Sequence, residues 1–378
     1  MTAIDVRPSP DAEAVAAAVA AALTTIDRNI ATFGTNYPGD TTTGGNYLDR
    51  GGNFGWTTSF WPGMTWLAHE LTGDASYARA AAGHVPSFAD RIHSLSDVDT
   101  HDLGFLYTLS CVVPWQLAED TVARDAAVAA ADHLLTRVLE PAGIIQAWGD
   151  MSDPRQQGRT IIDSLMNTPL LFWASSITGE SRYADIARRH TEQLRDNILR
   201  PDGTTFHTFY WDPAGGEPVR GETEQGSSDE SCWARGQAWG IYGFALNHRH
   251  TGDPSFRAAA ERCAERFLDR LPADSVPYWD LVFGDGSGQE RDSSAAAIAV
   301  CGLLTLGGDR YRAAAGRILT SLIDDYSTAG KPDSNALLRH GVYDKPKGVG
   351  VDEGNLWGDY FYLEALTRVT RPDWSDHW

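Results

Sequence analysis

Residues 248–263 read HRHTGDPSFRAAAERC, and the same pattern recurs along the chain. Close copies are HELTGDASYARAAAGH at 69–84 and SSITGESRYADIARRH at 175–190, and looser copies lie at 116–135 and 304–319. In the close copies a helix is predicted to end at the Thr-Gly step, because glycine readily adopts the left-handed conformation that ends many helices. An Asp or Ser that follows can cap the next helix. The repeat therefore predicts a series of helical hairpins.

The segments on either side of each copy differ in their apolar pattern. The preceding segment, such as RGQAWGIYGFAL at 235–246, is apolar on all sides, whereas the segment that follows, such as 181–199, has a single apolar face. The first kind of helix is buried and the second lies at the surface. With a helix at about 11–33 as the first outer element, we count six outer and six inner helices. This count predicts an all-α (α/α)6 toroid, formed by one domain over residues 1–378.

The predicted loops are long on one side of the toroid only. Those that lead from an outer to an inner helix span 34–55, 140–162, 200–232, 272–291 and 328–355. Long loops tend to carry function. We therefore expect the functional site at the N-terminal ends of the inner helices.

Charge and composition narrow the class of protein. The 378 residues carry 51 acidic and 31 basic side chains, a net charge of −20, without a Lys/Arg-rich run. This argues against nucleic acid or an anionic membrane as a partner. The Ala-rich N-terminus has acids and a proline where a secretory signal has basic residues. The widely spaced Cys111, Cys232, Cys263 and Cys301 are typical of buried free thiols. A cytoplasmic protein is predicted.

Two aspartates, Asp102 and Asp163, open successive apolar segments of the chain. One interpretation is helix capping, which stabilises by about 1 kcal/mol; Asp292 in RDSSAAA fits this role. The other is catalysis, because burial and a neighbouring carboxylate both raise the pKa of a carboxyl group. One protonated and one ionised carboxyl are the usual requirement of glycoside hydrolysis. The residues alone leave both interpretations open.

Arg235, two residues after Trp233, is the candidate for binding an anion. Burying an arginine is costly unless it meets a carboxylate, and its planar fork suits a bidentate ligand. A structural ion pair is the alternative. His207 and Gln225 lie in the longest loop, where surface exposure is the simpler expectation. The HExxH, clustered Cys/His and GxSxG patterns are absent from the sequence, so no metal, cofactor or catalytic serine is predicted.

Four blocks of sequence resemble the unsaturated glucuronyl hydrolases, glycoside hydrolase family 88. They are THDLGFLY at 100–107, DSLMNTPLLFWA at 163–174, SCWARGQAWGIYGFA at 231–245 and NLWGDYFYLEALTR at 355–368. The resemblance covers nearly the whole chain. It implies an oligosaccharide substrate, made by a polysaccharide lyase, that ends in a 4,5-unsaturated uronic acid. In that family an Asp protonates C4, water adds at C5, and the hemiketal collapses to release the next sugar.

The resemblance also implies roles for individual residues. Asp163 would be the proton donor and then the base toward water, and Asp102 the second carboxylate, which holds the sugar and keeps the donor protonated. The implied sugar and carboxylate contacts are Trp56, His101, Trp148, His207, Gln225, Trp233 and Arg235.

Two features bear on pH dependence and specificity. Glu224 stands where we expect His in many relatives, so we expect an altered pH profile. The C-terminal RPDWSDHW is expected to close over the leaving-sugar subsite. Because Arg371 is its one strongly basic residue, a preference for unsulfated disaccharides follows.

Other interpretations remain at this point. An unsaturated rhamnogalacturonyl hydrolase shares part of the pattern, and a conventional two-carboxylate glycosidase would act on saturated sugars. A sugar epimerase would need histidine pairs, and a non-catalytic sugar-binding toroid would not explain a buried Asp pair. The parent polysaccharide stays open. We expect a monomer or a weak homo-oligomer.

Overall fold

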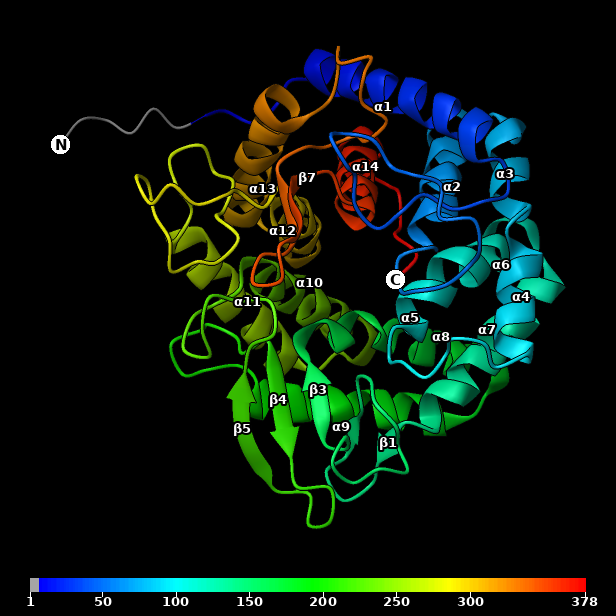
Figure 1. The fold of residues 1–378 in the computed structure, drawn as a ribbon, viewed down its shortest axis with the longest axis vertical. Coiled ribbons are helices and arrows are strands. Elements are labelled where there is room, and N and C mark those ends of the chain that lie inside the picture. The colour runs from blue at the N-terminus through cyan, green and yellow to red at the C-terminus, as the bar shows by residue number, and fades with distance from the viewer. Residues whose placement is uncertain (1–6) are drawn as a thin grey trace.

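The computed structural model describes residues 7–378, and its helices form two concentric rings (Figure 1). The outer ring consists of α1 (Ala12–Phe33), α3 (Ala75–Ala82) with α4 (Val85–His93), α7 (Thr121–Leu135), α9 (Ser181–Asn197), α11 (Pro254–Asp269) and α13 (Asp309–Ser321), which η3 (Leu322–Tyr326) extends. The inner ring consists of α2 (Phe60–Thr72), α5 (Leu103–Tyr107) with η1 (Thr108–Val112) and α6 (Val113–Ala118), η2 (Ile162–Met166) with α8 (Thr168–Thr178), α10 (Ala234–Thr251), α12 (Ser293–Leu306) and α14 (Leu356–Thr370). The predicted (α/α)6 toroid is confirmed.

The ring closes where the last helix, α14, meets α1 and α2. The last inner helix, α14, packs between α2 and α12, and α1 lies against it from outside. Among the described helices, α1 alone is long and apolar enough to cross a membrane, judged by length and composition. Here Val15, Ala22 and Ile26 of α1 are buried against the rest of the toroid.

The inner-to-outer turns have the geometry that the repeat predicts. Gly252 ends α10 with a φ of 70°, in the left-handed region. Asp253 then accepts a hydrogen bond from the Ser255 N–H at 2.8 Å and so caps α11. Gly73 and Asp74 do the same between α2 and α3.

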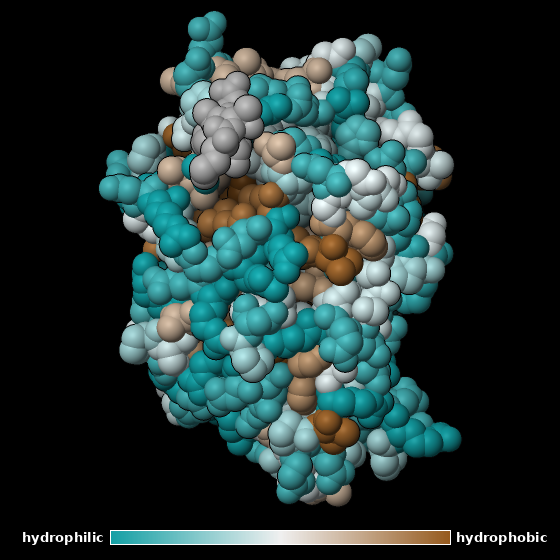
Figure 2. Space-filling model, turned by 90° about the vertical axis from the view of Figure 1, so that its left-hand side faces the viewer, coloured by the Kyte–Doolittle hydropathy of each residue, from teal (hydrophilic) through white to brown (hydrophobic). Residues whose placement is uncertain are grey.

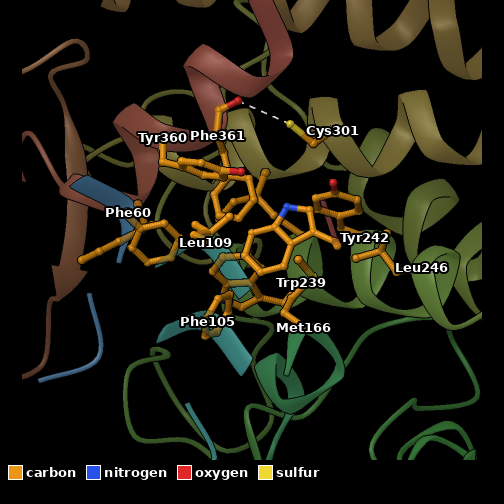
Figure 3. Close-up of a cluster of buried hydrophobic side chains, with 14 of the residues drawn as sticks. Phe60, Phe105, Leu109, Met166, Trp239, Tyr242, Leu246, Cys301, Tyr360 and Phe361 are labelled. Atoms are coloured by element: carbon orange, nitrogen blue, oxygen red, sulfur yellow. Dashed lines mark hydrogen bonds between the residues drawn. The ribbon is translucent and has the colours of Figure 1, made fainter. Parts of the chain in front are cut away.

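Aromatic side chains from the inner helices fill the centre of the ring (Figure 3). The Phe105 and Trp239 rings lie 5.3 Å apart, and Trp239 and Phe361 are separated by the same distance. Eight of the 13 Trp side chains are buried. The four cysteines are buried and free. The face of the molecule in Figure 2 is mostly hydrophilic, and hydrophobic residues gather in its upper half.

Short strands lie in the long loops beside the N-terminal ends of the inner helices, which form the mouth of the toroid. The strands are β1 (Val138–Leu139), β2 (Ile144–Ile145), β3 (Arg159–Ile161), β4 (Thr208–Trp211), β5 (Pro218–Glu222), β6 (Gly341–Asp344) and β7 (Val349–Glu353). They pair as β1-β2, β3-β4-β5 and β6-β7, all antiparallel. These sheets fix the loops beside the inner-helix N-termini.

The position of the C-terminal tail contradicts the prediction that it covers the leaving sugar. Asp376 pairs with Arg249 and Arg368, in the last turns of α10 and α14, and the Trp378 indole donates to Glu364 at 2.9 Å. The tail therefore enters the ring from the C-terminal ends of the inner helices and ends in its centre (Figure 1). Its last side chain, Trp378, stacks 5.8 Å from the Phe361 ring and lies 5.9 Å from the Phe105 ring, so it is buried beneath the mouth and does not close over it. The preference for unsulfated disaccharides loses its basis.

Candidate active site

A close approach between inner helices two and three positions the two aspartates. A Cβ at Gly104 would lie 2.2 Å from the Cα of Asn167, so only glycine leaves room for this contact. The Asn167 side chain accepts a hydrogen bond from the Phe105 N–H at 2.8 Å and ties the segments together. Asp102 and Asp163 head these two segments and are therefore brought to the same point of the mouth.

The two carboxylates meet on either side of one histidine. His101 Nε2 lies 3.3 Å from an Asp102 oxygen and 3.5 Å from an Asp163 oxygen. The imidazole is buried, with 1% of its side chain exposed, whereas Asp102 and Asp163 keep 18% and 15% exposure. A substrate can reach both carboxyl groups while His101 lies behind them. The two aspartates therefore converge, which the sequence alone left open.

Their surroundings separate the pKa values of the two carboxyl groups. The pKa of Asp163 is raised to about 6, chiefly by burial; His101 opposes the rise and the Asp102 charge adds to it. Burial also acts to raise the pKa of Asp102, but His101 and a hydrogen bond from the Thr100 hydroxyl at 2.7 Å bring it below its ordinary value. One group is thus suited to donate a proton and the other to remain ionised.

Capping does not account for either aspartate. Asp102 precedes α5 but forms no side-chain capping bond, and Asp163 lies inside η2. Asp292, by contrast, accepts from the Ser294 N–H at 3.1 Å and caps α12, as predicted. Asp359 accepts from two backbone N–H groups and the Tyr47 hydroxyl, so its contacts are structural.

Protein groups surround the Arg235 guanidinium. It lies 3.3 Å from Asp292 and donates to the carbonyl oxygens of Val342 and Tyr343 and to the Gln225 side-chain oxygen. Its side chain is 1% exposed and stacks 4.3 Å above the Trp233 ring. The structural ion pair, one of the two alternatives, is therefore present. Through its bond to Gln225 the arginine also orients a side chain of the mouth.

His207 is buried beside this group, contrary to the surface exposure that its loop position favours. Its Nδ1 accepts from the backbone N–H groups of Glu224 and Gln225 at 3.0 and 3.2 Å, and its ring lies 4.3 Å from Trp233. Burial, with a contribution from Arg235, lowers its pKa to about 3. The ring is therefore neutral, and because Nδ1 accepts, the proton is on Nε2.

Aromatic side chains complete the mouth. Trp56 donates from Nε1 to the Tyr343 hydroxyl at 3.0 Å and lies 5.1 Å from the Trp357 ring. Trp148 follows Ala147, whose carbonyl accepts from the His101 N–H at 2.8 Å. Sequence reasoning missed Tyr343 and Trp357. The block NLWGDYFYLEALTR contains Trp357 and could have indicated it. Tyr343 lies on a strand too short to be recognised in the sequence.

His101, Asp102 and Asp163 are also the one group of donors in residues 7–378 arranged to hold a metal, with ligand atoms within 4.8 Å of one another. The chemistry of the set fits a cation poorly. Burial opposes protonation of His101, but Asp102 and Asp163 outweigh it and raise the pKa of the imidazole above its ordinary value. A protonated imidazole nitrogen has no lone pair to offer a metal.

Known proteins are similar to this chain over nearly its whole length. The family model described as Glycosyl Hydrolase Family 88 matches residues 27–370. The unsaturated chondroitin disaccharide hydrolase of Streptococcus pyogenes serotype M1 is 45% identical over 375 residues, which cover 97% of this chain and 93% of that protein. The crystal structure of the unsaturated glucuronyl hydrolase from Streptococcus agalactiae matches with a TM-score of 0.95 at 43% identity and covers 98% of this chain and 95% of its own.

A mutant of the Streptococcus agalactiae enzyme, with asparagine in place of one aspartate, is complexed with dGlcA-GalNAc6S. It matches with a TM-score of 0.86 at 41% identity and covers 99% of this chain and 96% of its own. The family model spans most of the chain, and the two relatives named above cover 97% and 98% of it. The chain belongs to glycoside hydrolase family 88.

Proposed function

We propose that the protein removes a 4,5-unsaturated uronic acid from the non-reducing end of oligosaccharides that polysaccharide lyases produce. The observation that carries this function is the His101–Asp102–Asp163 cluster, with its acid and its ionised carboxyl at the mouth of the toroid. The unsaturated glucuronyl and chondroitin disaccharide hydrolases to which the chain is similar support the substrate class.

The chemistry follows from the two carboxyl groups. Protonated Asp163 donates its proton to C4 of the enol ether, and positive charge develops at C5 and the ring oxygen. Ionised Asp102 stabilises that charge electrostatically. Asp163, now a carboxylate, takes a proton from the water that adds at C5. The resulting hemiketal opens, the glycosidic bond breaks, and the next sugar leaves with its hydroxyl restored.

Neutral and cationic donors meet the sugar carboxylate in this proposal. His207 has its Nε2–H free of the backbone bonds that occupy Nδ1, and Gln225 has its amide nitrogen available because its oxygen accepts from Arg235. Arg235 supplies the positive charge behind them. Trp56 and Trp148, which are half-buried, offer ring faces for stacking against the sugar, whereas the buried Trp233 supports Arg235 and His207 from behind.

The test follows the ultraviolet absorbance of the C4–C5 double bond on incubation with lyase-made unsaturated disaccharides. Wild-type protein should remove this absorbance, and Asp163→Asn should abolish the loss while keeping the thermal melting temperature. Unchanged absorbance with the wild type on uronyl-hexosamine and uronyl-rhamnose disaccharides alike would refute the function. Activity on the rhamnose disaccharide alone would favour a rhamnogalacturonyl hydrolase, and wild-type turnover by the variant would refute the donor.

Two further predictions concern the state of the protein. We expect a cytoplasmic enzyme, in keeping with four buried free thiols. We also expect a monomer or a weak homo-oligomer, which light scattering over a range of concentrations would measure. Cell fractionation would test the compartment.

A further inference from the structure

We propose that Arg159 forms an acceptor subsite that binds an oxyanion on the part of the substrate beyond the scissile bond. This inference rests on the proposed function and adds to it the charge of the sugars that the enzyme favours. The oxyanion is either a sulfate ester on the leaving sugar or the carboxylate of a uronic acid further along a longer oligosaccharide.

Strands β3, β4 and β5 form one sheet (Figure 1). Arg159 belongs to a ladder of alternating cationic and aromatic side chains on this sheet. The register pairs Arg159 with Tyr210 and Tyr210 with Arg220, so the three side chains share one face of the sheet. The Arg159 guanidinium lies 4.7 Å from the Trp148 ring and 5.2 Å from the Tyr210 ring. Arg220 covers Tyr210 from the other side at 4.6 Å.

The charge of Arg159 has no acidic partner in this ladder. The chain carries 51 acidic residues, yet within residues 7–378 Arg159 forms no ion pair, and its Nε is buried without a hydrogen-bond partner. Arg220, at the outer end, is paired with Glu222. Stacking between two rings fixes the plane of a guanidinium and leaves its N–H edge available for a planar or tetrahedral anion.

The ladder begins beside the catalytic cluster. Ala147 donates its N–H to the Arg159 carbonyl at 2.8 Å, and its own carbonyl accepts from the His101 N–H at 2.8 Å. Along the chain Arg159 precedes Asp163 by four residues, so their Cα atoms are at most about 14 Å apart even in extended backbone. An acceptor sugar that leaves Asp163 along Trp148 therefore passes the guanidinium.

Other charges face the same region. Glu222 is neutralised by Arg220, and Glu224 lies 3.9 Å from the Lys347 ammonium group. These pairs leave Arg159 as the cation of the ladder without a counter-charge. An anionic substituent would supply it.

The experiment compares Arg159→Met, which keeps a long apolar stem but removes the charge, with Arg220→Met as the matched control on the same sheet. Three substrates are used: an unsulfated unsaturated disaccharide, its sulfated counterpart, and an unsaturated tetrasaccharide with an internal uronate. We expect Arg159→Met to lower the ratio of kcat/KM for an anionic over the unsulfated substrate about tenfold. Arg220→Met should change it less than about twofold, and Arg159→Lys should retain part of it.

The anionic substrate whose kcat/KM falls relative to that of the unsulfated disaccharide identifies the ligand. A fall for the sulfated disaccharide alone indicates a sulfate ester, and a fall for the tetrasaccharide alone indicates a uronate carboxylate. Equal effects of Arg159→Met on all three substrates, or none, would overturn the subsite. That result would leave the proposed function intact, because wild-type turnover of the unsaturated disaccharide tests the function separately.

Discussion

Substituting Gly104 by alanine should separate the two halves of the catalytic cluster. The added Cβ would lie 2.2 Å from the Cα of Asn167 and 2.4 Å from its carbonyl oxygen. Both atoms belong to backbone, so no side-chain rotation relieves the clash. The segment that carries Asp102 and the segment that carries Asp163 must move apart.

The distance sets the size of the effect. Ordinary contact of a Cβ begins at about 3.4 Å, so the two backbones must separate by roughly 1.2 Å. A displacement of about 1 Å at reacting groups reduces catalysis about 100-fold. Overpacking of this kind costs about 1–3 kcal/mol of stability, partly offset by the helical preference of alanine, about 1 kcal/mol better than glycine. We therefore expect a large loss of kcat with a fall of only a few degrees in Tm.

The assay measures kcat from the loss of ultraviolet absorbance and Tm by calorimetry on the same preparations. Gly83→Ala serves as the control, because a Cβ there would lie 3.3 Å from its nearest neighbour, the Ala80 carbonyl oxygen, and far from the mouth. It should leave kcat within about twofold. Wild-type kcat and Tm in Gly104→Ala would show that this close approach does not set the geometry of the aspartates.

The remaining predictions concern pH and the groups behind the sugar. Because the proton donor is the acid form of Asp163, with its pKa raised to about 6, kcat should fall as the pH rises above about 6; a pH–rate profile that climbs from pH 6 to 8 would contradict this. Glu224→Gln removes a negative charge and should move this fall in kcat to lower pH. The shift should be a few tenths of a pH unit, because the Glu224 side chain is 38% exposed and well screened. His207→Ala leaves two backbone N–H groups unpaired and should raise KM about tenfold or more, while an unchanged KM would separate His207 from substrate binding. Arg235→Lys loses the fork that spans Asp292 and two carbonyls and should cost roughly 3 kcal/mol, measured as a lower midpoint of urea unfolding; a midpoint within error of wild type would count against it.

The fold was predictable because the toroid repeats itself. Each Thr-Gly-Asp step marks the same local event, the end of a buried helix and the cap of an exposed one, and this information is local in sequence. The number of hairpins followed from counting these events. The small sheets at the mouth escaped prediction because strands of two to five residues carry too little alternation to be read.

The site was predictable only in part. Whether Asp102 and Asp163 cap or catalyse depends on a contact between distant segments at Gly104, which no local pattern encodes. Arg159 was missed because its role depends on strand register, and His207 is buried although its loop favoured exposure. Local patterns do not show which residues from distant segments act at one site, and only the resemblance to the family indicated this grouping.

The closure of the ring has a consequence for the synthesis of the enzyme. Helix α14 fills the gap between α2 and α12, and a Cβ at Gly63 in α2 would lie 2.9 Å from Tyr360 in α14, nearly 300 residues later in the chain. Tyr343, whose hydroxyl accepts from Trp56, and Trp357, which is buried behind Trp56, also come from the last part of the sequence. While the chain is being translated, the apolar flanks of α2 and α12 therefore have no partner, and such surfaces invite aggregation. We expect chaperone demand to be greatest just before α14 emerges from the ribosome, and a nascent chain to have no working pocket until then.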